Sequence, residues 1–241
     1  NKLITESKKN KVEILVGHHR RHNPLIKKAK ELLDKNLIGQ VRTVHIHCQM
    51  FKPDKYFKEA SWKKNDGAGP IFVNLIHDLD LMNYFFGKVR TVFANICTSK
   101  RGFNNEDVSS AILEFKSGIM GTFLCSDSVL SPWSWELTAR ENDVYPNTEE
   151  TCYFIGGTKG SLSLPNLKIW HHKNGHWMTP ISSTKYPFKI SDPLVNQIEH
   201  FSNVIQKKEK PIITASIANE TIKVIEAIKS SAKNKKLVKL I

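Results

Sequence analysis

The chain reads GAGPIFVNLIHDLDLMNYFFG from Gly67 to Gly87, and this stretch predicts an apolar helix that follows a glycine-rich turn. Gly67 and Gly69 allow the backbone to approach a ligand closely. Pro70 suits the first helical turn, because its missing N–H would have no partner there in any case. Gly87 suits the end of the helix.

The polar residues of this helix gather on one side. Asn74, His77 and Asp78 stand three and four positions apart, which places them on a common face. The opposite face is apolar and comprises Ile71, Leu75, Leu79 and Met82. A second polar segment, GHHRRHNP at residues 17–24, lies upstream, and the two segments together indicate a functional site. The alternative is a structural histidine at 77, with Asp78 and Asp80 on a solvated face.

Composition indicates a soluble globular chain. Its 241 residues are 40% hydrophobic, which is enough for a sizeable core. No stretch approaches the length of a membrane span, and residues 1–10 lack the apolar core of a signal peptide, so we predict no membrane association and a cytoplasmic location. Four scattered cysteines form no C-x-x-C pair and are expected to be reduced and buried, without zinc or disulfides: Cys48, Cys97, Cys125 and Cys152.

The formal net charge of +13 raises the question of nucleic-acid binding. The basic residues are mostly lysines and are spread from Lys2 to Lys239 without a recognition helix or an RNA-binding motif. The sequence therefore predicts no nucleic-acid partner.

The order of the predicted elements begins with the tail of a helix, residues 2–10, and a short buried strand, Val12–Val16, a pair typical of an alternating α/β sheet. A helix at residues 23–35, a strand at 41–50 and a polar loop at 52–66 follow. Further strands are predicted at residues 89–98, 107–115, 119–127, 134–140, 151–155, 161–164, 168–172 and 176–180, and further helices at residues 192–208 and 216–233.

This order predicts an α+β fold, with one open, mostly antiparallel sheet and helices on one of its faces. The composition of residues 116–118 and 173–175 predicts hairpin turns at both places. The strands at 111–115 and 120–125 are apolar, so we expect a second copy of the chain to cover the other face of the sheet.

Two histidine groups have spacing that metal ligands use: His45-x-His47, and His171-His172 with His176. In neither group does a nearby cysteine or carboxylate complete a tetrahedral set, so no metal site is predicted. Trp133 and Trp135 lie beside Glu136, a combination that suits a sugar ring, although tryptophans beside a strand also pack in the core.

These motifs, taken in order, resemble the Gfo/Idh/MocA family, which includes glucose-fructose oxidoreductase and inositol dehydrogenase. The resemblance runs across nearly the whole chain and rests on Val16-Gly17-His18, Arg21-x-Asn23-Pro24, Trp62, Gly67-Ala68-Gly69, Ile76-His77-Asp78-Leu79-Asp80-Leu81 and Gly157-Thr158-Lys159-Gly160.

The resemblance implies an NAD- or NADP-dependent oxidoreductase that acts on a sugar, a polyol or a related hydroxy compound. Residues 1–20 would be the remnant of a dinucleotide-binding Rossmann domain. Residues 21–241 would be the C-terminal domain that binds substrate and mediates a homodimer or homotetramer through the open sheet face. The family's Glu-Lys-Pro motif, with its catalytic lysine, would precede Asn1, so this chain alone would be inactive.

The family's residue roles carry over to particular positions. His77 would act in acid/base catalysis at the reacting hydroxyl, which suits a group that titrates near neutral pH. His18 and Arg21 would approach the cofactor. The family commonly has an aspartate where this chain has Val73, and a non-catalytic carbohydrate-binding or scaffolding homologue is the alternative function. Candidate substrate contacts are Asn74, Asp78, Trp62, Trp133 and Tyr145.

Overall fold

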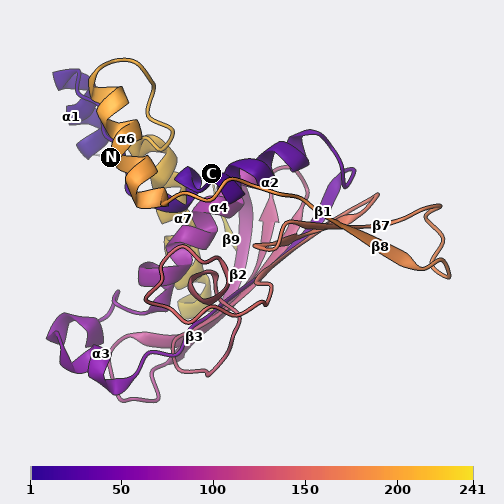
Figure 1. Cartoon of the computed structure of the whole chain (residues 1–241). Coiled ribbons are helices and arrows are strands. Elements are labelled where there is room, and N and C mark those ends of the chain that lie inside the picture. The colour runs from indigo at the N-terminus through magenta and orange to yellow at the C-terminus, as the bar shows by residue number, and fades with distance from the viewer. Residues whose placement is uncertain (1, 241) are drawn as a thin grey trace.

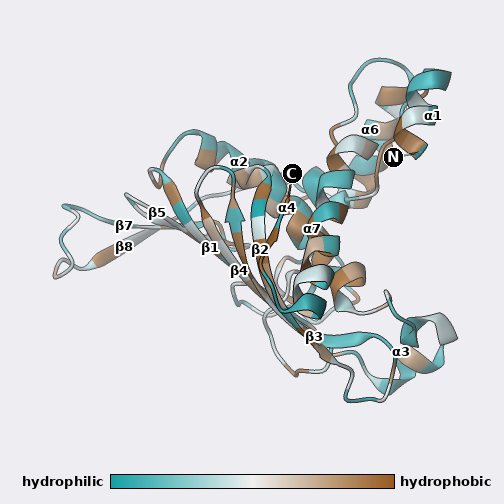
Figure 2. Ribbon diagram, turned by 180° about the vertical axis from the view of Figure 1, so that it is seen from behind, coloured by the Kyte–Doolittle hydropathy of each residue, from teal (hydrophilic) through white to brown (hydrophobic). Residues whose placement is uncertain are grey.

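A computed structural model describes residues 2–240 and shows one large sheet with helices packed on one face (Figures 1 and 2). Nine strands follow the order β8-β7-β6-β5-β1-β4-β3-β2-β9. Their bounds are β1 Val41–Gln49, β2 Val89–Thr98, β3 Glu106–Phe115, β4 Met120–Ser126, β5 Tyr153–Gly157, β6 Ser161–Leu164, β7 Lys168–His172, β8 Ile181–Lys185 and β9 Val238–Lys239.

Neighbouring strands run antiparallel throughout the described residues except at the centre, where β1 pairs with β4 in parallel. This arrangement confirms the predicted α+β fold with an open, mostly antiparallel sheet. The β7–β8 hairpin extends past the helical layer (Figure 1).

The helical layer consists mainly of α2, α4 and α7, with α6 beside α1 at one end (Figure 1). The helices are α1 Lys2–Asn10, α2 Pro24–Asp34, α3 Asp54–Lys58, α4 Ile76–Phe86, α5 Trp135–Thr138, α6 Pro193–Ile205 and α7 Ala215–Asn234. Short 3₁₀ turns span His19–His22 and Ser61–Lys64, and a π-helical turn at Ile71–Leu75 precedes α4.

The long helices begin at side-chain caps that the sequence specifies. The side chain of Asn23 accepts a 2.8 Å hydrogen bond from the N–H of Leu25, and Asp192 caps α6 in the same way. α7 is tied to β2 because the N–H of Ala94 donates to Ser231 Oγ at 2.9 Å. The predicted helices at 23–35, 192–208 and 216–233 are thus confirmed, with ends differing by a few residues.

Two predicted strands are wrong. Residues 134–140 contain the short helix α5, because the side chain of Ser134 accepts the N–H of Leu137 and starts a helical turn. Residues 176–180 belong to the turn region of a longer hairpin, and the strand β8 begins only at Ile181. In both places, local hydrogen bonding outweighs the alternation of side chains.

The first 20 residues also differ in part from the prediction. The helix at 2–10 is confirmed as α1. Val12–Val16 forms no strand: the segment makes one bridge, between Leu15 and Thr214, and Val12 is exposed. A strand needs a ladder of partners, and this segment has a single one in residues 2–240. The loop at 52–66 contains α3 and a 3₁₀ turn.

The sheet face opposite the helices is partly apolar. Six large side chains are exposed along its strands: Phe93, Ile112, Met120, Phe154, Trp170 and Ile181. Of the four free cysteines, Cys48, Cys125 and Cys152 are buried as predicted, whereas Cys97 is exposed. Among residues 2–240, no helix is long and apolar enough to cross a membrane.

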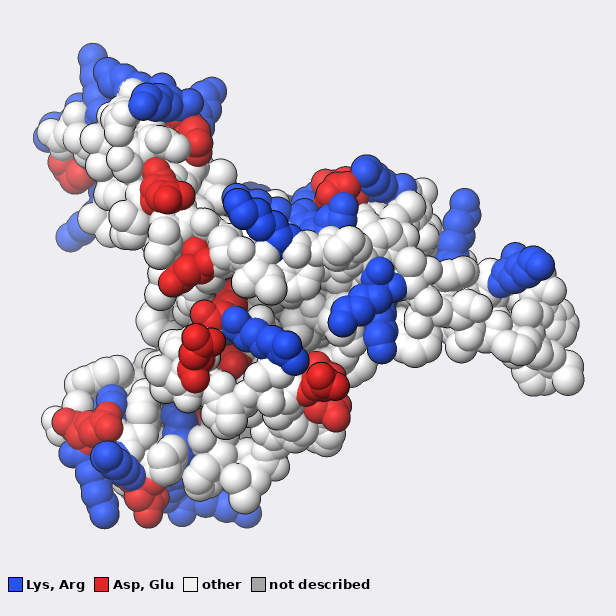
Figure 3. Space-filling model, viewed as in Figure 1, with Lys and Arg blue, Asp and Glu red and all other residues white. Residues whose placement is uncertain are grey.

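Lys and Arg side chains are spread over the face drawn in Figure 3, where they alternate with acidic groups. On this face they do not gather into the single basic patch that phosphate binding requires.

Candidate active site

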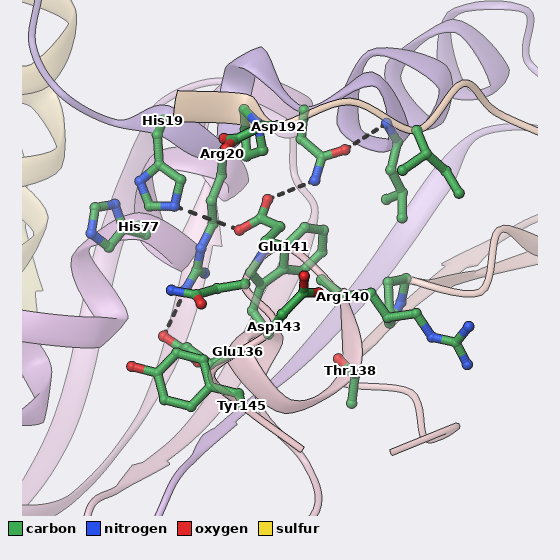
Figure 4. Close-up of a pocket in the computed structure, with 18 of the residues that line it drawn as sticks. His19, Arg20, His77, Glu136, Thr138, Arg140, Glu141, Asp143, Tyr145 and Asp192 are labelled. Atoms are coloured by element: carbon green, nitrogen blue, oxygen red, sulfur yellow. Dashed lines mark hydrogen bonds and ion pairs between the residues drawn. The ribbon is translucent and has the colours of Figure 1, made fainter. Parts of the chain in front are cut away.

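A cavity of about 1090 Å³ opens between α4, α5 and the start of α6. The π-helical turn and α4 contribute Asn74 and His77, α5 contributes Glu136, and the loop after α5 contributes Glu141 and Tyr145. Figure 4 shows His77 and His19 side by side at one end, with Glu136 and Glu141 nearby, while Arg140 extends away from them.

The π-helical turn at Ile71–Leu75 sets the direction of Asn74 and His77. The carbonyl oxygen of Gly69 accepts the N–H of Val73 at 3.1 Å, and Glu106 accepts the N–H of Ile71 at 3.0 Å. Gly69 has no side chain, and a Cβ there would overlap the Glu106 carboxylate. The glycine at 69 therefore makes room for the carboxylate that fixes the start of the turn. Such turns often lie at functional sites.

His77 is surrounded by other rings. The ring centroids of His18 and His19 lie 5.5 and 5.1 Å from that of His77, both edge-on. Burial, followed by the positive charge of Arg20, lowers the pKa of His77 to about 2. Its Nδ1 is buried and has no hydrogen-bond partner within residues 2–240. His77 is therefore uncharged at neutral pH and can accept a hydrogen bond from a hydroxyl group.

Arg20 is buried and contributes to the lining of the cavity. Its guanidinium donates to Asp78 at 2.7 Å and to Glu136 at 2.9 Å, and its carbon lies 5.5 Å from the Trp135 ring centroid. Burial lowers the pKa of Arg20, but the carboxyl groups of Asp78 and Glu136 outweigh it, and the net shift is well upward. The cation is therefore permanent, and two carboxyl groups of the protein already neutralise it.

Glu136 and Asn74 form a small acceptor group beside His77. Asn74 Nδ2 donates to Glu136 Oε1 at 3.3 Å. The other oxygens of the two residues, Asn74 Oδ1 and Glu136 Oε2, are buried and have no hydrogen-bond partner in the described part of the chain. A buried acceptor without a donor is costly, so these two atoms are suited to a ligand that donates.

Glu141 occupies the far side of His19. It accepts a 2.6 Å hydrogen bond from Asn23, and it lies 3.5 Å from His19 Nε2. Burial raises the pKa of Glu141, but the hydrogen bonds from His19 and Asn23 and the charge of Arg20 outweigh it, and the net shift is downward. Glu141 is therefore a carboxylate at neutral pH.

The structure brings three of the predicted site residues to the cavity: His77, Asn74 and Tyr145. Asp78 is buried and is not part of the lining; it accepts hydrogen bonds from Arg20 and from the Tyr153 hydroxyl. Its side chain is therefore engaged inside the protein.

The two predicted tryptophan contacts lie outside the cavity lining. Trp62 is 53% exposed in the 3₁₀ turn after α3, and Trp133 is 40% exposed with its Nε1 donating to Glu150. Trp135, by contrast, is fully buried and packs on Tyr153. It thus has the core position that the sequence analysis gave as the alternative to a sugar contact.

Of the two predicted cofactor contacts, His18 lies against His77 and has a buried Nδ1 with no hydrogen-bond partner in residues 2–240. Arg21 binds Asp80 through two hydrogen bonds of 2.7 Å, and its guanidinium stacks over Tyr84. Arg21 therefore holds α4, and His18 is the one of the two with a free polar atom beside the cavity.

Sequence reasoning missed the carboxylates of the site. Glu136 was noted only as a neighbour of two tryptophans, and Glu141 carries no motif. Arg20 lies in the polar segment at 17–24, but its partners Asp78 and Glu136 are 58 and 116 residues away. Contacts at such separations cannot be read from local spacing.

The histidine pair of β1 forms its own contact on the open sheet face. His45 Nε2 and His47 Nε2 are 3.0 Å apart, and His45 Nδ1 lies 2.6 Å from the Thr122 hydroxyl. Within residues 2–240, no three His, Cys, Asp or Glu side chains are grouped so that they could share a metal ion.

Two proteins with described functions are similar to this chain in sequence. Oxidoreductase P35 of Formosa agariphila is 27% identical over 228 residues, which cover 89% of this chain and 64% of the relative. The myo-inositol 2-dehydrogenase of Thermotoga maritima is 30% identical over 129 residues, which cover 50% of this chain and 36% of the relative. The chain thus spans less than two thirds of the length of either protein.

The fold is shared with the WlbA dehydrogenase of Bordetella pertussis, solved in complex with NADH and UDP-GlcNAcA. The TM-score is 0.75 at 18% identity, and the match covers 100% of this chain and 67% of that one. Residues 30–240 also match the Gfo/Idh/MocA family model described as "Oxidoreductase family, C-terminal alpha/beta domain". The chain therefore belongs to the Gfo/Idh/MocA oxidoreductase family, and these residues are its C-terminal α/β domain.

Proposed function

We propose that this chain is the substrate-binding part of an NAD- or NADP-dependent oxidoreductase that oxidises a hydroxyl group of a sugar or polyol. The observation that carries this proposal is the uncharged His77, which lines a large cavity next to the unpartnered acceptors of Asn74 and Glu136. The oxidoreductase relatives, one of them an inositol dehydrogenase, support the reaction class.

In this proposal His77 accepts the hydrogen bond of the reacting hydroxyl and takes its proton as the carbon loses hydride. A bound nicotinamide supplies the hydride acceptor. Because burial keeps the pKa of His77 low, the imidazole holds this proton only transiently at neutral pH and releases it to water in the open cavity. Asn74 and Glu136 orient the substrate by accepting hydrogen bonds from neighbouring hydroxyls.

The residues beside His77 fit a cofactor only at its nicotinamide end. His18 has an unpartnered Nδ1 among the described residues and its ring lies edge-on to that of His77, which supports our proposal that it contacts the nicotinamide. The sequence contains no G-x-G-x-x-G phosphate loop. We propose that residues 1–20 adjoin a dinucleotide-binding domain and that the domain of residues 21–241 binds the substrate.

We also propose that a second copy of the chain covers the open sheet face. The six exposed side chains on that face would lose contact with water in a dimer or tetramer. Sedimentation or light scattering of the wild type and of Ile112→Asp tests this: the variant should shift toward smaller species, and an unchanged mass distribution would contradict the proposal.

The function is tested on the full-length protein. Nicotinamide fluorescence on addition of NADH or NADPH measures cofactor binding and identifies the preferred cofactor. His77→Ala should lower kcat for the sugar or polyol that the wild type oxidises by roughly 10²- to 10⁴-fold, because it removes the proton acceptor, and should leave cofactor binding intact. Turnover at the wild-type rate would disprove the role of His77.

The alternative is a non-catalytic carbohydrate-binding or scaffolding homologue, and Val73 in place of the family's aspartate favours it. Sugar binding by a full-length protein that neither binds nicotinamide nor turns over would support this alternative.

A further inference from the structure

The His77 end of the cavity has acceptors but lacks a free cation among the described residues. Arg20 is the cation closest to His77 in the site, and Asp78 and Glu136 both bind its guanidinium. A substrate carboxylate close to Arg20 would lie beside Glu136, which accepts from one of the terminal guanidinium nitrogens. It would also meet the unpartnered oxygens of Glu136 and Asn74, which repel an anion and attract hydrogen-bond donors.

The lining of the whole cavity also carries more negative than positive charge. Its lining carries four Lys or Arg side chains and six carboxylates. The cations are Arg20, Arg140, Lys168 and Lys185; the carboxylates are Glu136, Glu141, Asp143, Glu149, Glu150 and Asp192. Arg140 lies 3.6 Å from Glu149, so this second arginine has an acidic neighbour as well. An anionic sugar would enter a cavity with an excess of negative charge.

We infer that the cavity selects an uncharged, polyhydroxylated substrate over the corresponding sugar acid, and that Glu136 determines this preference. Glu136 does so in two ways. It helps to neutralise Arg20, and its free carboxylate oxygen accepts a hydrogen bond from the substrate hydroxyl next to the one that donates to His77. This inference rests on the proposed function, since it concerns the substrate of the same site.

The two actions of Glu136 are separable by mutation. Glu136→Gln keeps the size of the side chain but removes its charge, so Arg20 keeps only Asp78 as its counter-charge and the excess negative charge next to His77 is lost. Asn74→Ala removes the neighbouring acceptor and leaves Arg20 paired. The first variant should therefore gain acceptance of sugar acids, and the second should only lose affinity for neutral sugars.

The experiment compares D-glucose with D-glucuronate and D-galactose with D-galacturonate, using the full-length protein with its cofactor. kcat/KM and calorimetric binding are both measured. The wild type should prefer the neutral member of each pair. Glu136→Gln should weaken neutral binding by roughly tenfold and shift the ratio toward the acid by a further factor of about ten. Asn74→Ala should weaken neutral binding without improving the acid.

Glu149→Gln is the matched control, because Glu149 also lines the cavity but is exposed and pairs with Arg140. It should leave the preference between the two members of each pair unchanged. A shift in Glu149→Gln as large as that in Glu136→Gln would overturn the role of Glu136. Thermal unfolding of each variant establishes that it is folded. If Glu136→Gln does not fold, Asn74→Ala still tests whether hydrogen-bond acceptors beside His77 bind neutral sugars.

Failure of this inference is distinguishable from failure of the proposed function. Oxidation of both members of a pair with equal kcat/KM would leave the proposed function intact and overturn the selectivity. Failure of the full-length protein to bind either NADH or NADPH would overturn both.

Discussion

Arg21 binds Asp80 through two parallel hydrogen bonds of 2.7 Å, Nε to Oδ2 and Nη2 to Oδ1. The two residues are 59 positions apart, and both side chains are buried. Together with the adjacent pair Arg20–Asp78, this contact fixes the 3₁₀ turn at His19–His22 against α4. The position of the histidines relative to one another thus depends on two buried ion pairs.

Removing one partner of the Arg21 pair should be strongly destabilising. Asp80→Ala leaves a buried guanidinium without its carboxylate, and we expect a loss of about 3–5 kcal/mol in the free energy of unfolding. Urea unfolding followed by circular dichroism measures this. The control is Glu114→Ala, which removes an exposed pair with Arg90 and should cost about 0–1 kcal/mol. Equal losses in the two variants would contradict a structural role for the Arg21–Asp80 pair.

Stability should fall in mild acid because of His77. The unfolded chain takes up a proton at His77 below its ordinary pKa of 6.5, whereas the folded chain does so only near pH 2. Protons therefore favour the unfolded state between these values, and the contribution is lost progressively as pH falls from 6.5. The slope is at most about 1.4 kcal/mol per pH unit.

Urea unfolding at pH 7.5 and pH 5.0 measures this effect. The wild type should lose up to about 2 kcal/mol through His77 between the two pH values, and His77→Gln should lose correspondingly less. His176→Gln, on the exposed hairpin, is the control and should match the wild type. A His77→Gln variant with the full wild-type pH dependence would show that His77 titrates normally in the folded protein.

The elements of the fold that were predicted correctly have local signals in the sequence. Short stretches of sequence show the alternation of apolar residues in residues 89–126 and the caps at Asn23 and Asp192. The corresponding strands and helices were predicted correctly. Residues 134–140 were misassigned because a four-residue helix is too short to show its own periodicity. Val12–Val16 was misassigned because its composition suits a strand, whereas a strand also needs partners that local sequence does not show.

The candidate site was predictable only along its own helix. The faces of α4 follow from three- and four-residue spacing, and its apolar residues Leu79 and Met82 are indeed buried. Asp78 shares the spacing of His77 but turns toward Arg20, 58 positions away. Tertiary contacts decide which polar residue of a helix faces a cavity and which faces a buried cation. The local sequence pattern does not show these contacts.

Gly69 should tolerate no side chain, for a reason that concerns the site. A Cβ at this position would overlap the carboxylate of Glu106, which accepts the N–H of Ile71. Gly69→Ala should therefore break that hydrogen bond and cost about 1–3 kcal/mol. In the full-length protein it should also lower kcat, because Asn74 lies in the π-helical turn and His77 follows it in α4.

The control for this prediction is Gly67→Ala, where space is open but the backbone has φ +82°. Its cost should be limited to local strain of about 1 kcal/mol, with kcat unchanged. If both variants lowered kcat equally, the contact between Gly69 and Glu106 would not be what positions the site.

Two adjacent glycines in β5 should differ in their tolerance of alanine. A Cβ on Gly157 would overlap the carbonyl oxygen of Ile38, which is backbone and cannot move aside, whereas a Cβ on Gly156 would meet the hydroxyl of Thr43. Gly157→Ala should therefore cost about 1–3 kcal/mol. Gly156→Ala should cost less, since Thr43 can adopt another rotamer. Thermal unfolding of the two variants measures the difference, and a larger loss for Gly156→Ala would show that the backbone at Ile38 yields more easily than the threonine side chain.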